Sequence, residues 1–382
     1  MDNLIDRTTC IVCGSNNLET ICETSPMPVF QGCVTSPIES DINTPMDWRI
    51  CTECGSVMLA KTLPLDVIYM EGHATSLGGI WNEHHQLFAT FVEKHRCGDV
   101  LEVGGGVGKL GQYYRREGGD APWLILEPNP LNISQPESGV TFVQGFLDHK
   151  FTLPEHVETI VFSHSLEHIY DLANMIELLS EKLPDTGRLV VAWPQMDRWL
   201  QQGLPGALNW EHTFYVPIDV LLELMASRGF ILNEQHDFGD GHSYFLAFSK
   251  GKKRPFVTNH DQIANSRYLV KNYWQSFEAR VTAINKIIGE SPTPLWVSPA
   301  SVYTQYLFAF GLETSNLAGI LDNAQVKQGK RLYGTPGEVE SPSIIENTTC
   351  TVIINAGAHT QEILHQFSTI NPSATLINAM EF

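Results

Sequence analysis

The stretch Leu101-Glu-Val-Gly-Gly-Gly-Val-Gly108 decides the fold, together with Leu124-Ile-Leu-Glu127-Pro further along the chain. The first stretch has the pattern Glu-x-Gly-x-Gly-x-Gly and lies between a predicted strand and a predicted helix. Glycines at the carboxyl end of a strand let the backbone turn tightly and approach a ligand closely. An acidic residue at the end of the next strand can bind the two hydroxyls of a ribose. The pattern therefore predicts a cofactor that contains a nucleoside.

The spacing of the glycines indicates which cofactor. A dinucleotide site usually shows Gly-x-Gly-x-x-Gly, with a helix N-terminus facing a pyrophosphate. Here Glu102 lies in the loop, and a carboxylate is a poor neighbour for a pyrophosphate but suits a cation such as the amino group of S-adenosylmethionine. An ordinary strand-to-helix turn is the alternative interpretation. We expect S-adenosylmethionine as the cofactor, bound by Glu102, Gly104, Gly106, Gly108, Glu127, Gly145 and Ser163.

Composition excludes several classes of function. The chain has 382 residues, 43% of them hydrophobic, which is enough for two or three domains. Its formal charge of −19, from 24 basic and 43 acidic residues, argues against nucleic acid and anionic membrane surfaces as partners. We interpret the basic cluster at 251–255 as a solvated linker. No apolar run is long enough to span a membrane, and the N-terminus has no apolar signal segment, so we expect a cytoplasmic protein.

Four of the eight cysteines form two matching pairs, Cys10-x-x-Cys13 and Cys51-x-x-Cys54, and each pair is followed by Gly-Ser. Two such tight turns can direct four thiolates to one point, which is a closed tetrahedral zinc site. Closed coordination leaves no position for water, so we expect the zinc to be structural. Disulfides are unfavourable in a cytoplasmic chain, and a redox Cys-x-x-Cys is the remaining alternative. We interpret the other cysteines as packed or free thiols.

From residue 98 the sequence alternates between predicted strands and helices. The strands cover 99–103, 123–127, 140–143, 159–163 and 188–193, and the helices cover 109–118, 172–183 and 218–228. This alternation predicts a mainly parallel sheet covered on both faces, with ligands beyond the carboxyl ends of its strands. After the basic cluster, a long helix over 265–288 and several short strands predict a second, smaller α/β domain. The expected domains are 1–62, 63–250 and 251–382.

Two histidine clusters follow predicted strands at the ligand-binding edge: His164-Ser-Leu-Glu167-His168 and Asn209-Trp-Glu211-His212. Methyl transfer requires removal of a proton and then in-line attack on a sulfonium methyl group. A histidine with a pKa near neutrality suits the first step, and a neighbouring carboxylate can orient its ring. The alternatives are local packing or capping, and a metal site. Zinc-peptidase signatures require histidines on a long helix, so a metallohydrolase is the less favoured interpretation.

A third segment completes a resemblance to a known family. It reads Leu321-Asp-Asn-Ala-Gln-Val-Lys-Gln-Gly-Lys330, followed by Tyr333-Gly-Thr-Pro-Gly337. With the cysteine pairs and the glycine loop, in this order, the chain resembles the bacterial sugar C-methyltransferases, which act on nucleotide-linked keto-deoxysugars. The resemblance spans nearly the whole chain. It implies a class I methyltransferase-type, Rossmann-like α/β sheet with a zinc module before it and a nucleotide-sugar-binding α/β domain after it.

The resemblance also implies roles for individual residues. His212 would be the base that removes the proton beside a ketone, and Glu211 and His168 would orient groups or stabilise the enolate oxygen. A tyrosine after the zinc module also contributes in the family, and Tyr69 is the nearest candidate. The last domain would bind the nucleotide, although a solvated turn is the alternative for its lysines. The expected substrate-binding residues are Asp322, Lys327, Gly329 and Lys330.

Two departures from the family pattern leave other functions open. The family's loop reads Glu-Val-Gly-Ser-Asn-Asp-Gly, whereas this chain has Gly105-Gly-Val107 at its centre. The family's Tyr-His-Glu-His stretch becomes Asn209-Trp-Glu-His212. An O- or N-methyltransferase, a catalytically idle module that binds the cofactor or the nucleotide, and a nicotinamide oxidoreductase are therefore alternatives. The expected partner is a small-molecule substrate, and the oligomeric state does not follow from the sequence.

Overall fold

The structure is a computed structural model that describes residues 4–68, 79–129, 139–239, 241–289 and 293–382. The chain forms two compact units. The first consists of Met1–Glu19, Arg49–Trp199 and Glu211–Arg267, and the second of Thr20–Trp48, Leu200–Trp210 and Tyr268–Phe382. The chain thus enters the second unit three times. The domain boundaries expected after residues 62 and 250 stay predictions.

The first unit is built on a seven-stranded sheet in the order β11-β10-β9-β12-β13-β16-β15. The first five of these strands are parallel, and β16 runs antiparallel to both of its neighbours. This order is that of the class I methyltransferase sheet, so the predicted α/β fold is confirmed. The bounds of the strands are β9 Asp99–Val103, β10 Trp123–Glu127, β11 Val140–Gln144, β12 Val157–Ser163, β13 Arg188–Pro194, β15 Phe230–Phe238 and β16 Ser243–Lys250.

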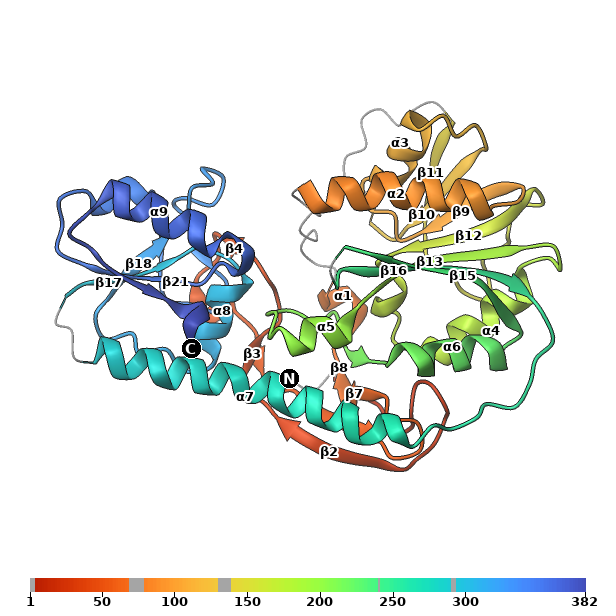
Figure 1. The fold of residues 1–382 in the computed structure, drawn as a ribbon, viewed down its shortest axis with the longest axis horizontal. Helices are drawn as coiled ribbons and strands as arrows, with labels where there is room; N and C mark the ends of the chain where they lie inside the picture. Colours follow the sequence, from red (N-terminus) through yellow and green to blue (C-terminus); the bar gives the residue numbers. More distant parts are fainter. Residues whose placement is uncertain (1–3, 69–78, 130–138, 240, 290–292) are drawn as a thin grey trace. The chain divides into compact units, whose positions relative to one another are not determined.

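Helices cover both faces of this sheet (Figure 1). On one face, Phe88 and Val92 of α2 (Gly79–His95) share a core with Leu110 and Tyr114 of α3 (Lys109–Arg116). On the other face, α4 (Leu172–Lys182) and α6 (Ile218–Ser227) bury apolar side chains three or four residues apart. Two further helices are short: α1 (Leu65–Ile68) and α5 (Met196–Gln201). Apolar side chains of these helices therefore cover both faces of the sheet. Ligands in such sheets bind at the carboxyl ends of the strands, which the helices do not cover.

The cysteine pairs are anchored to the same unit. Residues Cys10, Cys51 and Cys54 lie in the core beneath α4 and α6, and the amide of Ala173 donates a 3.0 Å hydrogen bond to the carbonyl of Ile11. Small strand pairings surround them: β1 with β8, and a four-stranded sheet in the order β14-β7-β6-β2. These strands are β1 Ile5–Asp6, β2 Leu18–Glu23, β6 Asp47–Cys51, β7 Val57–Leu59, β8 Lys61–Thr62 and β14 Phe214–Tyr215.

The second unit contains a parallel five-stranded sheet in the order β20-β18-β17-β21-β22. Helix α9 (Thr360–Ile370) packs on one face, and α8 (Val302–Ala309) with the end of α7 (Asp261–Ile288) packs on the other. The sheet strands are β17 Leu295–Ser298, β18 Leu317–Leu321, β20 Val339–Glu340, β21 Thr351–Ile354 and β22 Thr375–Asn378. The predicted second α/β arrangement is therefore present.

Residues 20–48 are held in the second unit by short strands and one ion pair. Strand β4 (Cys33–Val34) pairs with β19 (Arg331–Leu332), and β3 (Met27–Pro28) pairs with β5 (Asn43–Thr44). The guanidinium of Arg331 lies 2.6 and 2.7 Å from the two carboxylate oxygens of Asp41, whose side chain is fully buried. A bidentate pair of this kind fixes the position of both segments.

The predicted elements are present with small differences at their ends. The helix expected over 109–118 ends at Arg116, and the one expected over 265–288 begins at Asp261. Helix α2 was not predicted. Among the residues that the structure describes, no helix combines the length and the apolar composition needed to cross a bilayer.

Candidate active site and cysteine cluster

The glycine loop follows β9 and turns through three left-handed glycines, Gly104, Gly106 and Gly108, with φ angles of +73°, +54° and +76°. A side-chain carbon on Gly108 would lie 2.7 Å from the ring of Phe142, and one on Gly104 would lie 2.9 Å from Ser165. A carbon on Gly106 would meet no atom of the described residues within 4 Å. Packing therefore requires glycine at positions 104 and 108. Gly106 instead borders open space in which a ligand can approach the backbone.

Glu127 closes one side of this loop. Its Oε2 accepts a 2.9 Å hydrogen bond from the amide of Gly106, and its Oε1 accepts one of 3.0 Å from the amide of Asn129. The amide of Gly145 donates to the backbone carbonyl of Glu127 at 3.1 Å. The hydroxyl of Ser163, at the end of β12, is buried and has no hydrogen-bond partner within the described ranges. These groups lie at the carboxyl ends of adjacent strands, and they fit the nucleoside part of S-adenosylmethionine.

Glu102 lies beneath the loop. Only 2% of the residue is exposed, and its Oε2 accepts a 2.7 Å hydrogen bond from Nε1 of Trp123. Burial raises the pKa of Glu102 to about 7, while the Trp123 hydrogen bond lowers it and the charge of Glu127 raises it further. A side-chain carbon on Gly105 would lie 2.8 Å from the Glu102 carboxyl carbon. Contact between Glu102 and the cofactor stays a prediction.

The predicted catalytic histidines lie together. The ring centres of His168 and His212 are 4.8 Å apart, and Glu167 joins them in a group whose ligand atoms lie within 4.8 Å of one another. Glu167 is 1% exposed; burial acts to raise its pKa, but the hydrogen bond and charge of His164, with the charges of His168 and His212, leave that pKa below its ordinary value. Glu211 is half-buried beside His212 in the chain. Tyr69 lies outside the described residues.

Arg7, which the sequence analysis did not identify, links the two histidine segments. It is buried, and its guanidinium donates to the carbonyl of Tyr170 at 2.9 Å and to the carbonyl and hydroxyl of Thr213 at 3.1 and 3.0 Å. Tyr170 follows His168 closely, and Thr213 follows His212 directly. Burial lowers the pKa of Arg7 to about 10. A single planar donor therefore sets the distance between the two backbone segments.

A further group of histidines was also missed. His84, His164 and His242 each have a ring nitrogen within 4.8 Å of the others. Trp81 packs edge-on against all three rings. Burial lowers the pKa of His84 below its ordinary value and that of His242 to about 3, with smaller contributions from neighbouring histidines. The paired histidines at 84–85 after Trp81, on a helical pattern, are the signal that could have indicated this group.

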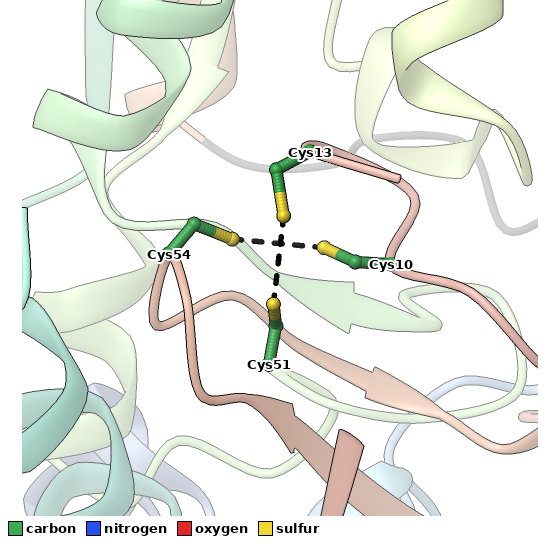
Figure 2. Close-up of side chains that lie close together, drawn as sticks. All are labelled: Cys10, Cys13, Cys51 and Cys54. Carbon is green, nitrogen blue, oxygen red and sulfur yellow. Dashed lines mark hydrogen bonds between the residues drawn. The ribbon is translucent and has the colours of Figure 1, made fainter. Parts of the chain in front are cut away.

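The four predicted cysteines converge (Figure 2). The sulfur atoms of Cys10 and Cys54 are 3.6 Å apart, and those of Cys13 and Cys51 are 3.5 Å apart. A disulfide requires about 2.05 Å, whereas zinc–sulfur bonds of about 2.3 Å in a tetrahedron separate the sulfurs by roughly 3.8 Å. The two turns match, because Gly14 donates to the Cys10 carbonyl at 3.0 Å and Gly55 to the Cys51 carbonyl at 2.9 Å. The donor set and spacing fit a structural zinc ion.

The expected substrate-binding residues form one turn of the second unit. Asp322 is buried, and its carboxylate accepts hydrogen bonds from the amides of Ala300 and Ala324 at 3.0 and 2.8 Å. The ammonium of Lys327 lies 2.9 Å from that carboxylate. Gly329 has a φ of +71° and donates to the Val339 carbonyl at 2.9 Å, and the amide of Lys330 donates to the Lys327 carbonyl at 3.1 Å. Asp322 therefore holds the turn together, and its role toward a substrate stays a prediction.

Comparison with protein families identifies the domain that contains the glycine loop. Residues 81–235 match the family model described as a methyltransferase domain. The chain therefore contains a methyltransferase domain, and its enzyme class is methyltransferase. The match covers the glycine loop, Glu127 and both His164 and His168, so the predicted enzyme class is confirmed. It leaves out the cysteine pairs and most of the second unit of the methyltransferase.

Two similar solved structures each align with less than half of this methyltransferase. One is an S-adenosylmethionine-dependent methyltransferase from Mesorhizobium loti, with 14% identity over 43% of this chain and 96% of that one, and a TM-score of 0.35. Another is human N-acetylserotonin methyltransferase in complex with S-adenosylmethionine, with 17% identity over 45% and 52% of the two chains and a TM-score of 0.38. No curated protein matches the sequence.

Proposed function

We propose that the methyltransferase transfers a methyl group to a carbon atom beside the ketone of a nucleotide-linked keto-deoxysugar. The observation that carries this proposal is the contact between His168 and His212, whose ring centres are 4.8 Å apart next to the buried carboxylate of Glu167. A carbon acid needs a base to form the nucleophile, and a histidine beside a carboxylate is suited to that role. The sequence resemblance to sugar C-methyltransferases supplies the substrate class.

In the proposed reaction, His212 takes the proton from the carbon beside the ketone. The electron pair of that bond moves into an enolate, whose oxygen is stabilised by His168, and Glu211 orients the groups around His212. When bound, S-adenosylmethionine would supply an electrophilic methyl group on a sulfonium sulfur. The enolate carbon would form the new carbon–carbon bond to this methyl group as the methyl–sulfur bond breaks, and the electron pair of that bond would stay on sulfur in a neutral thioether. The proton on His212 passes to water. The residues contribute mainly by holding the carbon in line with the methyl group.

The residues of the glycine loop would hold the methyl donor. Gly104, Gly106 and Gly108 shape the backbone, and Glu127 is positioned to exchange its hydrogen bond with Gly106 for the hydroxyls of a ribose. Gly145 and Ser163 line the ends of the neighbouring strands. The carboxylate of Glu102 would provide a negative charge beneath the loop, near the cationic part of the methyl donor.

We further propose that Cys10, Cys13, Cys51 and Cys54 bind a structural zinc ion. Support comes from sulfur–sulfur distances of 3.5 and 3.6 Å and from the absence of an open position between four thiolates. We also propose that the turn with Asp322, Lys327, Gly329 and Lys330 binds the nucleotide, with the lysines near its phosphates.

The proposal is tested by separating proton removal from methyl transfer. The full chain is incubated in D₂O with S-adenosylhomocysteine and a panel of nucleotide-linked keto-deoxysugars. We expect deuterium to enter the carbon beside the ketone above the uncatalysed rate. With S-adenosylmethionine instead, we expect a product that is one methylene heavier. His212→Asn should abolish both signals, whereas His236→Asn, at an exposed strand residue, should retain both.

Three outcomes count against the proposal. Methyl transfer without enzyme-dependent deuterium exchange would favour an oxygen or nitrogen acceptor. Binding of S-adenosylmethionine without transfer to any member of the panel would favour an idle binding module or another acceptor. Wild-type exchange in His212→Asn would remove His212 from the role of base.

A further inference from the structure

Three histidines from separate elements meet in the first unit. His84 lies on α2, His164 follows β12, and His242 lies between β15 and β16. One ring nitrogen of each lies within 4.8 Å of the others. The ring centres are 5.1, 5.4 and 5.5 Å apart, so they form a nearly equilateral triangle. None of these residues has a role in the proposed methyl transfer.

The size of this triangle matches a metal site. Metal–nitrogen bonds of about 2.1 Å in a tetrahedral arrangement place three imidazole ring centres roughly 5.3 Å apart. Imidazole nitrogen is a ligand that suits zinc, copper and nickel ions. Three protein ligands also leave a fourth position open, in contrast to the closed arrangement of four thiolates.

His84 provides an independent observation. It is fully buried, and neither Nδ1 nor Nε2 has a hydrogen-bond partner in the part of the chain that the structure describes. Buried polar groups are nearly always paired, because an unpaired one loses its hydration without compensation. The ring is enclosed by Phe88, Phe238 and Phe245, which offer no hydrogen-bonding side chain. A metal ion between the three rings would satisfy one of its nitrogens.

The other two rings are oriented toward a common point. Nδ1 of His164 lies 3.1 Å from Oε1 of the buried Glu167, which is the carboxylate–histidine arrangement that orients metal ligands. This leaves Nε2 of His164 for a metal. Both that nitrogen and Nδ1 of His242 approach the buried hydroxyl of Ser243, at 2.7 and 2.6 Å. The hydroxyl therefore marks the point that the two rings share.

We propose that His84, His164 and His242 form a second metal site, for one divalent transition-metal ion such as Zn²⁺. The fourth coordination position is open to water, to the Ser243 hydroxyl or to an oxygen atom of a bound molecule. This site is separate from the four cysteines, and it does not depend on which acceptor is methylated.

The test uses the untagged full chain and Co²⁺ as a spectroscopic probe. Thiolate ligands give intense charge-transfer absorption that imidazole ligands lack, so each site has its own signature. We expect the wild type to bind a Co²⁺ equivalent without that absorption. His84→Phe, which suits the aromatic surroundings, should weaken this binding at least 100-fold and leave any thiolate signal unchanged. His85→Phe, next to the trio but outside it, should bind Co²⁺ as the wild type does.

His242→Gln gives a second variant, on a turn rather than in the core, should His84→Phe fail to fold. The same loss of the imidazole signal is expected there. The proposal is overturned if the wild type shows thiolate-bound Co²⁺ only, or if the imidazole-type equivalent persists with unchanged affinity in a folded His84→Phe or His242→Gln chain. The first outcome would indicate that Ser243 joins the rings by hydrogen bonds alone. Loss of the thiolate signal in Cys10→Ser reports on the other site separately.

Discussion

The indole Nε1 of Trp123 donates a 2.7 Å hydrogen bond to the carboxyl group of Glu102, in the core directly below the glycine loop. The two residues occupy neighbouring strands, β9 and β10. Because the carboxyl group is buried, its ionised form loses hydration that one neutral donor does not replace. This explains why the pKa of Glu102 rises to about 7. The carboxyl group of Glu102, which lies below the glycine loop, thus has a pKa near neutral pH.

We predict that Glu102 makes the first unit less stable as the pH rises. A folded-state pKa of about 7, against an ordinary value of 4.5, means that the folded chain binds the proton more tightly. The stabilisation is fully present below pH 4.5 and is lost as the pH rises through 7, in total about 3 kcal/mol. Glu102→Gln keeps an acceptor for Trp123 and does not ionise. The melting temperature of this variant relative to the wild type should therefore increase from pH 5 to pH 8.

Trp123→Phe provides the control for this prediction. It removes the donor that lowers the pKa of Glu102, so the pH at which stability falls should move upward. A constant difference in melting temperature between wild type and Glu102→Gln across this range would show that the Glu102 pKa is not raised.

Two glycines of the loop should respond differently to alanine. Gly106 and Gly108 both have left-handed φ angles, so alanine costs about 1–2 kcal/mol at either position. Only at Gly108 does the new carbon also meet the Phe142 ring, at 2.7 Å, which adds about 1–3 kcal/mol. We expect Gly108→Ala to lower the melting temperature more. Gly106→Ala should lower S-adenosylmethionine affinity at least 10-fold in calorimetry, because its carbon occupies the open space beside the loop.

If Gly106→Ala bound S-adenosylmethionine with wild-type affinity, the open space beside Gly106 would not be part of the cofactor site. Equal melting temperatures for the two variants would show that Phe142 moves aside without cost.

The sheet and the loop could be predicted because their signals are local. Short apolar runs that end in turns mark β9, β10 and β12, and the carboxyl ends of adjacent parallel strands bring Glu127 and Ser163 to one edge. The same reasoning placed His168 after a central strand. The resemblance assigned roles to both His168 and His212, whose ring centres lie 4.8 Å apart, and these roles stay predictions.

The remaining features depend on contacts between distant parts of the chain. Arg7 acts through carbonyls of Tyr170 and Thr213, and no local pattern identifies a carbonyl as a partner. His84 lies near His164 because α2 packs on the sheet, and this packing brings together residues that are far apart in the sequence. Strands β4 and β19 pair although they are far apart in the sequence. Each strand has only two residues, which is too short to show a hydrophobic periodicity.

We predict that the four-cysteine cluster binds about one zinc ion per chain that survives dialysis. Cys10→Ser should lose this metal and lower the yield of folded protein, because structural zinc contributes about 10 kcal/mol or more to folding in small zinc modules. Metal analysis and the melting temperature measure both effects. Cys97→Ser is the matched control, since the Cys97 thiol lies outside the four-cysteine cluster, near the carbonyls of Glu158 and Thr186. A stable Cys10→Ser protein with unchanged zinc content would contradict the assignment.

The last prediction concerns Arg7, whose guanidinium spans Tyr170 and Thr213. Lysine keeps the charge but has one nitrogen, so it cannot bond both segments in the same geometry. We expect Arg7→Lys to destabilise the first unit by about 1–3 kcal/mol, because buried carbonyls lose their donor. The ring signals of His168 and His212 should shift in NMR spectra of histidine-labelled protein, and that of the exposed His359 should not. Unchanged signals from both histidines would show that Arg7 stabilises the unit without positioning them.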